Sequence, residues 1–384
     1  PDQSGAPSLA AKPSPDGLAA KPRFLDFFAG SGLVSQALER WFELVWANDV
    51  CPKKGSVFRA NHPAGRLVLG SVAEVRGAEV PGAELSWASF PCQDLSLAGS
   101  AKGIRASRSG LVWQWLRVMD EMAERPRLVV AENVVGLLSS REGADYLELH
   151  QALEARGYRV GAMVLDAARF VPQSRPRVFV VGLAADHPLA PGLTDDGPNW
   201  LHPAPVMRVA GRLPRFVWWR MPEPPQRTKH LSDLLDLARP CHDAATSRKN
   251  LELIPPTHRL RLEACGLDVV PGYRRIRNGR QVLELRFDDV AGCLRTPAGG
   301  SSRQLLVVRQ DGQWRTRLLA AAEAARLMGA PARFRLPVGE TEAYRAMGDA
   351  VAAPVAAYLA RHLLAALARA ARAGASRLPA LGAS

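Results

Sequence analysis

Apolar runs and helical patterns alternate along the first half of the chain. Runs rich in β-branched and aromatic residues predict strands at Arg23–Phe28, Leu44–Ala47, Glu84–Ser89, Leu128–Ala131, Tyr158–Leu165 and Val178–Leu183. Apolar residues spaced three and four apart predict helices between them, at Leu33–Trp41, Leu111–Glu124 and Tyr146–Arg156. This alternation favours βαβ units and therefore an α/β, Rossmann-like fold, with a parallel sheet covered by helices on both faces.

The pattern changes after Pro188. Pro, Trp and Arg are interspersed up to about Arg315, and strand-like runs occur only at Gln281–Phe287 and Gln304–Arg309. We expect a smaller, irregular, β-containing domain there, and Ala/Leu-rich helices at Thr316–Met328 and Ala352–Arg372. The predicted organisation is a disordered leader (1–20), a first domain (21–195), a second domain (196–315), a helical part that returns to the first domain (316–372) and a tail (373–384).

Composition narrows the class of protein. With 384 residues, 47% of them hydrophobic and 23% charged, the chain can bury a substantial core. We find no apolar run near the roughly 18 residues that span a bilayer, which predicts a soluble protein. The five cysteines are scattered and form no C-x-x-C pair, and the histidines show no ligand spacing. This argues against a disulfide framework or a metal site and indicates a reducing cytoplasm.

The positive charge is concentrated in the second domain. The whole chain carries +13, and residues 200–317 hold 21 Lys or Arg against 11 Asp or Glu, a net of +10. A basic segment of this kind is typical of a protein that binds a phosphate backbone. Most of these residues are Arg, which an Arg-biased genome would also produce, so charge alone leaves nucleic-acid binding open.

Two strand ends indicate a nucleoside-containing cofactor. The first predicted strand runs into Phe28-Ala29-Gly30-Ser31-Gly32, and two glycines there let a ligand approach the backbone closely. The second strand ends at Asp49, where a carboxylate can accept hydrogen bonds from ribose hydroxyls. A third glycine of the dinucleotide pattern is missing, so a tight turn with a surface carboxylate remains an alternative.

Further polar residues follow the later strands, at the edge where α/β sheets place ligands. Phe90-Pro91-Cys92-Gln93 follows one strand, Glu132 ends the next, and Arg175 and Arg177 precede another. A thiol and a carboxylate at one sheet edge suit covalent chemistry with proton transfer. The segment Ser96–Ser109 has the glycines and basic residues of a mobile loop that closes over a phosphate backbone.

Together and in this order, these motifs resemble the DNA (cytosine-5) methyltransferase family. The resemblance extends from Phe24 to about His362. Phe28–Gly32 looks like the family's first cofactor motif, Pro91-Cys92-Gln93 like its nucleophile motif, and Glu132-Asn133-Val134 like its acid motif. Similar elements are Gln173-x-Arg175-x-Arg177, the segment Arg317–Pro331 that supports the recognition domain, and Gly348-Asp349-Ala350-Val351, the last cofactor motif.

The resemblance implies an S-adenosylmethionine-dependent enzyme that methylates carbon 5 of cytosine in double-stranded DNA, with S-adenosylhomocysteine as the product and no metal. Cys92 is then the nucleophile, Glu132 the acid at ring nitrogen 3, and Arg175 and Arg177 hold the cytosine and brace Glu132. The family flips its target base out of the duplex. The second domain becomes the target-recognition domain.

The resemblance also implies binding residues. Those for the cofactor are Phe28, Ala29, Gly30, Ser31, Gly32, Leu33, Asp49, Val50, Ser71, Val72, Pro91, Leu111, Asp349, Ala350 and Val351. Those for DNA are Gln93, Ser96, Lys102, Arg105, Gln173, Arg295, Arg303 and Gln304. Two positions depart from the family pattern: Ser71 stands where an Asp is usual, and Asp349 where an Asn is usual. Both departures are expected to weaken cofactor binding.

Three other interpretations stay open at this point. A tRNA-directed cytosine methyltransferase can share the catalytic set, although the basic insert favours duplex DNA. A catalytically silent DNA-binding relative, or a nicotinamide-dependent oxidoreductase, would explain fewer of the motifs. We expect a monomer in the bacterial cytoplasm, associated with the nucleoid and with no membrane partner. A separately encoded restriction endonuclease is its partner if it belongs to a restriction–modification pair.

Overall fold

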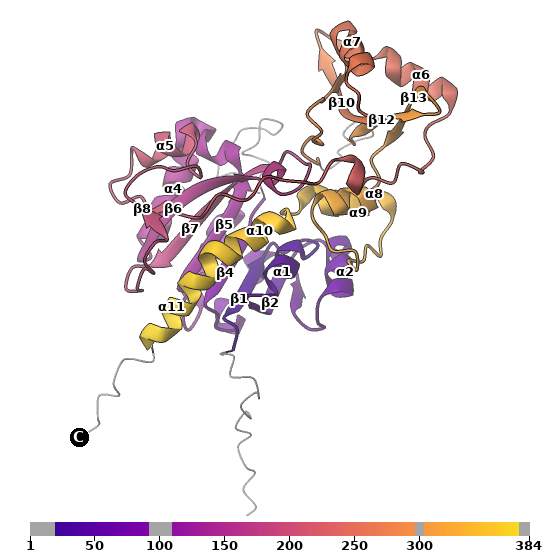
Figure 1. The fold of residues 1–384 in the computed structure, drawn as a ribbon. Helices are drawn as coiled ribbons and strands as arrows, with labels where there is room; N and C mark the ends of the chain where they lie inside the picture. Colours follow the sequence, from indigo (N-terminus) through magenta and orange to yellow (C-terminus); the bar gives the residue numbers. More distant parts are fainter. Residues whose placement is uncertain (1–19, 92–109, 296–302, 376–384) are drawn as a thin grey trace, which may run out of the picture.

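A seven-stranded sheet forms the centre of the larger of two lobes (Figure 1). The computed structural model describes residues 20–91, 110–295 and 303–375. Along the chain the strands are β1 (Arg23–Phe27), β2 (Glu43–Asp49), β3 (Leu67–Leu69), β4 (Leu85–Ser89), β5 (Leu128–Val134), β6 (Tyr158–Asp166) and β7 (Pro176–Ala184). Their spatial order is β3-β2-β1-β4-β5-β7-β6. The α/β, Rossmann-like class expected from the sequence is confirmed.

The sheet is mixed, whereas the sequence analysis expected it to be parallel. Strands β1 to β5 pair in parallel, but β7 runs antiparallel to both β5 and β6. Only residues 167–175 join β6 to β7. A parallel crossover needs a dozen or more residues, so this connection can only return the chain as an antiparallel neighbour.

Helices cover both faces of the sheet. They are α1 (Leu33–Leu38), α2 (Pro52–Asn61), α3 (Leu111–Glu121) and α4 (Ala144–Glu154). Neighbouring β1 residues belong to different cores, Phe24 to one and Leu25 to the other, because successive side chains of a strand point to opposite faces. Burial on both faces explains why these strands appear in the sequence as continuous apolar runs.

The C-terminal part packs back on this lobe. Its helices are α8 (Ala321–Leu327), α9 (Glu340–Asp349), α10 (Ala353–Leu359), the π-helical turn η7 (Ala360–Leu364) and α11 (Ala365–Ala375), and α10 lies against α1. Helical residues 340–370 contain a window of mean hydropathy 1.5 that is long enough to cross a membrane, contrary to our expectation from the sequence. Because 61% of that window is buried inside the protein, packing in the core accounts for its apolar character.

A second sheet forms the smaller lobe. It consists of β10 (Val269–Arg277), β11 (Arg280–Leu285), β12 (Leu305–Gln310) and β13 (Gln313–Leu318), antiparallel in the order β11-β10-β12-β13. The helices α6 (Ala244–Glu252) and α7 (Pro256–Ala264) accompany it, and a separate core includes Ile254, Leu262 and Val307. The helix expected at Thr316–Met328 is wrong in its first turn, because Thr316 pairs with Val307 in the sheet.

Residues 194–221 pack on the larger lobe, although the sequence analysis assigned most of them to the smaller domain. The hairpin β8 (Thr194–Asp195) and β9 (Trp218–Trp219) flanks α5 (Ala204–Ala210). Trp219 is fully buried, and its indole N–H donates to the carbonyl of Val181 in β7 at 3.3 Å. Trp219 therefore belongs to the core of the larger lobe.

Candidate active site

The candidate residues of the larger lobe gather where the parallel strands end. The chain leaves β1 toward β2 on one side, whereas β4 lies on the other side of β1. Parallel α/β sheets bind ligands outside the carboxyl ends of their strands at such a reversal of strand order. The ends of β1, β2, β4 and β5 therefore define the place to look for a site.

The turn after β1 is held open by backbone conformation and by Asp49. Phe28, Gly30 and Gly32 all have positive φ angles (58°, 56° and 82°). The carboxylate of Asp49 accepts the backbone N–H of Gly30 and that of Cys51, both at 2.8 Å. An ionised carboxylate has about four acceptor positions, so Asp49 can accept further hydrogen bonds from a ligand.

Gly32 allows a close approach of two segments. A Cβ atom at this position would lie 2.4 Å from the imidazole Nε2 of His62, which contacts the carbonyl oxygen of Gly32 at 2.9 Å. Burial lowers the pKa of His62. Any side chain at Gly32 would thus push α2 away from the turn.

The other residues predicted to hold the cofactor lie around this turn with different exposures. Val50 is 67% exposed. The hydroxyl of Ser71 accepts the N–H of Ala73 at 3.3 Å and so begins the short helix η1 (Val72–Glu74). Ala29, Ser31, Leu33, Val72 and Val351 are buried, whereas Pro91, Leu111 and Ala350 are half-buried.

The loop after β4 is anchored by an amide from β5. The buried side chain of Asn133 donates to the carbonyl of Phe90 at 3.0 Å, and its oxygen accepts the N–H of Val134 at 2.8 Å. Pro91 follows directly. The predicted nucleophile Cys92, with Gln93, Ser96, Lys102 and Arg105, lies outside the described residues.

Glu132 lies near the carboxyl end of β5, two residues before Val134, and faces Arg177 of β7. In the sheet register Glu132 lies opposite Ser89 of β4, and its carboxylate is 3.2 Å from Nε of Arg177. Burial raises the pKa of Glu132, although Arg177, Arg175 and a hydrogen bond from Ser89 act in the opposite direction. A carboxyl group in this state can hold a proton at a higher pH than usual and can donate it to a bound base.

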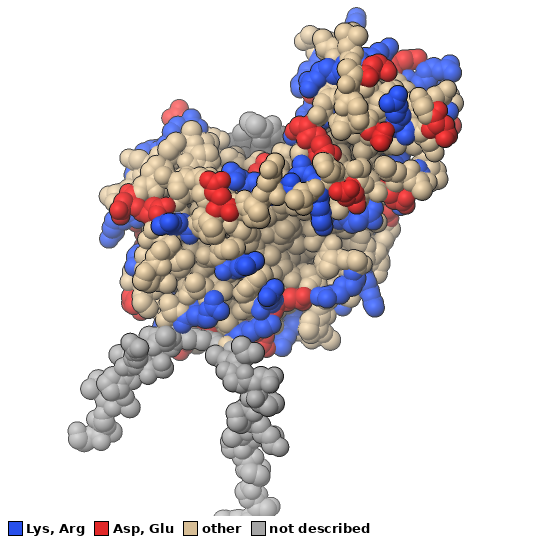
Figure 2. All heavy atoms as spheres, in the orientation of Figure 1, with Lys and Arg blue, Asp and Glu red and all other residues tan. Residues whose placement is uncertain are grey.

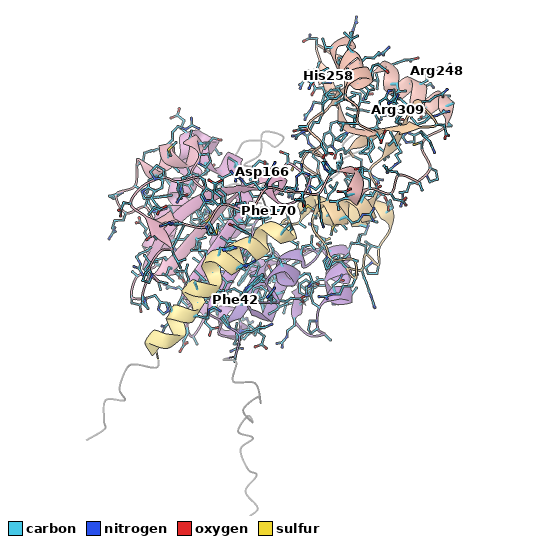
Figure 3. All side chains as sticks on the ribbon, in the orientation of Figure 1. Phe42, Asp166, Phe170, Arg248, His258 and Arg309 are labelled. Carbon is cyan, nitrogen blue, oxygen red and sulfur yellow. The ribbon has the colours of Figure 1, made fainter. Side chains whose placement is uncertain are left out.

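Arg175 is a buried link between three segments. Its guanidinium donates to the carbonyls of Leu294 (3.2 Å), Gly348 (2.8 Å) and Ala350 (2.6 Å). Asp166, labelled in Figure 3, accepts the backbone N–H of Arg175 at 2.6 Å. Burial lowers the pKa of Arg175, and Nε has no hydrogen-bond partner within the described part of the chain. The sequence analysis expected Arg175 to hold the base, but two of its nitrogens are already engaged.

The residues predicted to read DNA from Gln173 onward also differ in exposure. Gln173 is fully buried, donates to the carbonyl of Leu327 at 2.8 Å and accepts the N–H of Leu294. Arg303 donates to the carbonyl of Leu319 at 2.7 Å and pairs with Glu340 at 3.0 Å. Both side chains hold segments of the free protein together, and their contact with DNA stays a prediction.

A cavity of about 470 Å³ separates the segment that precedes β7 from the sheet of the smaller lobe. Among its lining residues are Tyr273, Cys293, Arg295 and Gln304. Arg295 is exposed and lies over the Tyr273 ring, 5.4 Å from its centroid. Gln304 is fully buried, and neither atom of its amide finds a partner among residues 20–91, 110–295 and 303–375.

Charge on the smaller lobe is mixed. Figure 2 shows Lys and Arg side chains interspersed with Asp and Glu on this lobe. Glu284 pairs with both Arg275 and Arg277, and Asp288 pairs with Arg286. These ion pairs tie up individual arginines but leave the net charge of +10 unchanged, because that sum already subtracts the 11 acidic residues.

Sequence reasoning assigned no role to several residues of this region. Ser89 positions Glu132, and Asn133 anchors the Phe90 loop; the sequence analysis assigned neither role, although Asn133 belongs to the acid motif. Asp26 is completely buried, accepts the Ser35 hydroxyl at 2.6 Å, and burial raises its pKa to about 7. The only sequence signal for the role of Asp26 was its carboxyl group inside an otherwise apolar strand.

Comparison with known proteins gives one family. The family model for C-5 cytosine-specific DNA methylases matches residues 22–365. The chain is 27% identical over 349 residues to the type II methyltransferase M.NlaX of Neisseria lactamica, which covers 90% of this chain and 97% of that protein. It is also 28% identical over 387 residues to a DNA-cytosine methyltransferase of Escherichia coli (strain K12), covering 89% of this chain and 77% of that one.

Solved structures with the same fold span nearly the whole chain. The crystal structure of the Schizosaccharomyces pombe Dnmt2 methyltransferase superposes with a TM-score of 0.59 at 18% identity, covering 91% of this chain and 99% of that one. A prophage-encoded DNA modification methyltransferase from Escherichia coli gives 0.56 at 18% identity, covering 91% and 100%. At these identities the likeness establishes the fold alone.

Proposed function

This chain belongs to the C-5 cytosine-specific DNA methylase family, and we propose that it methylates carbon 5 of cytosine at a specific sequence of double-stranded DNA, with Cys92 as its nucleophile. The observation that carries the proposal is the contact of Glu132 near the carboxyl end of β5. Glu132 faces Arg177 there, one strand away from the Phe90-Pro91 loop that leads into Cys92.

Cys92 supplies the nucleophile and Glu132 the proton donor that an unreactive ring needs. Carbon 5 of cytosine is a poor nucleophile, so the thiolate of Cys92 adds to carbon 6 while Glu132 donates a proton to ring nitrogen 3. Electron density then builds up at carbon 5. After methylation, loss of the carbon 5 proton restores the double bond and releases Cys92, and ring nitrogen 3 returns its proton to Glu132. The raised pKa of Glu132 supports its role as the proton donor.

The two arginines have separate tasks in this proposal. Arg177 contacts the Glu132 carboxylate through Nε at 3.2 Å, so we assign it to the base that Glu132 protonates and to the charge that develops there. Arg175 is a positioning residue, because its donors hold the carbonyls of Leu294, Gly348 and Ala350. It fixes the last motif and the recognition segment relative to β7.

The turn after β1 fits S-adenosylmethionine, the methyl donor of this family. The positive φ of Gly30 exposes backbone to a ligand, Val50 offers an exposed apolar surface for a base, and Asp49 retains acceptor positions for ribose hydroxyls. The hydroxyl of Ser31 is buried and has no partner in the described residues. When bound, the cofactor supplies an electrophilic methyl group. We assign its binding to these residues together with Phe28, Ser71 and Asp349.

Access to the target base requires extrusion from the duplex, which costs a few kcal/mol. We propose that the segment containing Gln93, Ser96, Lys102 and Arg105 contacts the DNA, and that the smaller lobe reads the sequence with Arg295 as an exposed contact. One chain carries all the proposed catalytic residues, so we propose a monomer that acts on cytoplasmic DNA, where a separately encoded restriction endonuclease is its partner in a restriction–modification pair.

The experiment is a transfer assay with S-adenosylmethionine labelled in its methyl group. A pool of duplex DNA of random sequence and a pool of structured RNA are incubated with the full chain, and the labelled nucleoside is identified. We expect 5-methylcytosine in the DNA alone, confined to one short sequence. Label in RNA only would contradict the proposed substrate, and label on an adenine or on cytosine nitrogen 4 would contradict the proposed chemistry.

A further inference from the structure

Two ion pairs join α2 to α9, and they differ in their surroundings. Lys53 pairs with Glu342 at 2.8 Å, and its side chain is 62% exposed. Lys54 pairs with Asp349 at 2.5 Å, and its side chain is only 24% exposed. The first is a surface ion pair of the kind that contributes little, whereas the second is half-buried, with the Asp349 side chain 35% exposed.

Lys54 crosses the turn after β1. A Cβ atom placed on Gly30 would lie 4.0 Å from Cδ of Lys54, so the stem of this lysine runs beside the backbone that the cofactor is proposed to approach. Asp349, its partner, ends α9, immediately before the Ala350-Val351 segment. A cation and an anion therefore lie together at the edge of the glycine turn.

The charge on Lys54 is maintained there. Burial alone would lower its pKa, but Asp349 and, more weakly, Asp49 outweigh burial, and the pKa of Lys54 is raised. The lysine stays protonated throughout the physiological range, so any ligand that enters meets a fixed positive charge beside a carboxylate.

We infer that Lys54 and Asp349 bind the amino-acid end of the methyl donor, Lys54 its carboxylate and Asp349 its ammonium group. This rests on the proposed placement of S-adenosylmethionine at the turn after β1. The amino-acid end carries one negative and one positive charge. The free protein offers the matching charges, the Lys54 ammonium for the carboxylate and the Asp349 carboxylate for the ammonium group. Binding exchanges one ion pair for two charge-assisted pairs, so no charge is left uncompensated.

The inference makes Lys54 a binding residue for one half of the ligand only. S-adenosylhomocysteine carries the amino-acid end, whereas 5′-methylthioadenosine has the same adenosine and thioether and lacks it. A residue that only held α2 against α9 would affect both ligands equally, because both would use the same turn. The ratio of the two affinities therefore reports the proposed contact.

The experiment measures binding of both compounds to the full chain by calorimetry, without DNA. Lys54→Gln is expected to weaken S-adenosylhomocysteine about 10- to 100-fold, as for loss of a hydrogen bond to a charged group, and to leave 5′-methylthioadenosine within about twofold of wild type. Lys54→Arg retains the charge and should recover most of the lost affinity. Lys53→Gln is the matched control, because it removes the neighbouring tie between the same helices, and both affinities should stay unchanged.

Three results separate the possibilities. Equal weakening of both ligands by Lys54→Gln would overturn the inference and leave the pair a structural tie. An unchanged affinity for S-adenosylhomocysteine, with a melting temperature that shows the variant is folded, would overturn it as well. Wild-type protein that binds neither compound would contradict the proposed cofactor site itself, and with it the inference.

Discussion

Replacement of Glu132 by Gln removes the acidic proton that the carboxyl group can donate and leaves the side-chain volume almost unchanged. The amide oxygen of Gln can still accept Nε of Arg177 and the Ser89 hydroxyl, so the end of β5 should keep its geometry. Exchange of a charged acceptor for a neutral one costs about 1 kcal/mol. The variant should therefore fold and bind S-adenosylhomocysteine like the wild type.

The catalytic effect of the same substitution is much larger. A positioned general acid contributes about 10²- to 10⁴-fold, which corresponds to about 3–5 kcal/mol in the transition state. We expect Glu132→Gln to slow single-turnover methyl transfer to a duplex with one target site by that factor. Because the protonated form donates, the wild-type rate should also lose its Glu132-dependent contribution as pH rises through the raised pKa, and the variant should not.

Ser89→Ala is the companion variant. It keeps the carboxyl group and removes one hydrogen bond that lowers the pKa of Glu132, so we expect a loss of about tenfold or less and a further rise of that pKa. If Glu132→Gln transfers methyl groups within about threefold of the wild-type rate, Glu132 is not the proton donor and the argument from its burial is wrong.

Three further substitutions test the structure around the site. Glu323→Ala leaves Arg317 buried without its two 2.8 Å contacts, so the free energy of unfolding in urea should fall by about 3–5 kcal/mol. Asp26→Asn removes a carboxyl whose pKa is raised to about 7 by burial. The folded state binds the extra proton, so the stabilisation from Asp26 is complete below about pH 4 and is lost as pH rises through 7; the variant should melt above wild type at pH 8 and lose that advantage by pH 5. Gly32→Ala meets both a φ of 82° and His62, so it should weaken binding of S-adenosylhomocysteine and lower the melting temperature.

For each of the three substitutions, one result would contradict the expectation. A loss below about 1 kcal/mol for Glu323→Ala would mean that water reaches Arg317. A pH-independent difference in melting temperature would show that Asp26 does not titrate as inferred. Gly65→Ala is the control for Gly32, because Gly65 has a φ of 78° with no atom within 4 Å of the added Cβ. An equal effect of both alanines would leave backbone strain as the only cause.

The larger sheet was predictable because its strands are buried on both faces. Continuous apolar runs gave β1, β2, β4, β5, β6 and β7 to within a few residues. The three-residue β3 and the polar helix α2, Pro52–Asn61, carry too little apolar pattern for detection. The direction of β7 depends on the length of the preceding connection. The pattern of apolar residues carries no information about that direction.

The candidate site was predictable in its chemistry and less so in its contacts. Glu132 and Arg177 do face each other, which residue order at the strand ends suggested. The burial of Gln173 could not be anticipated, because it depends on packing against Leu327, which is 154 residues away in the sequence. The pairing of Lys54 with Asp349, from opposite ends of the chain, is of the same kind.

The most direct test of the central claim is covalent capture on DNA that carries 5-fluorocytosine in random sequence context, with S-adenosylmethionine present. Fluorine at carbon 5 blocks the last elimination, so the wild-type chain should form a stable adduct, and sequencing of the captured DNA should return one short site. Cys92→Ser should form no adduct while it still binds DNA and cofactor. A wild-type protein that binds both and forms no adduct, or a Cys92→Ser variant that does form one, would contradict the assignment of Cys92 as the nucleophile.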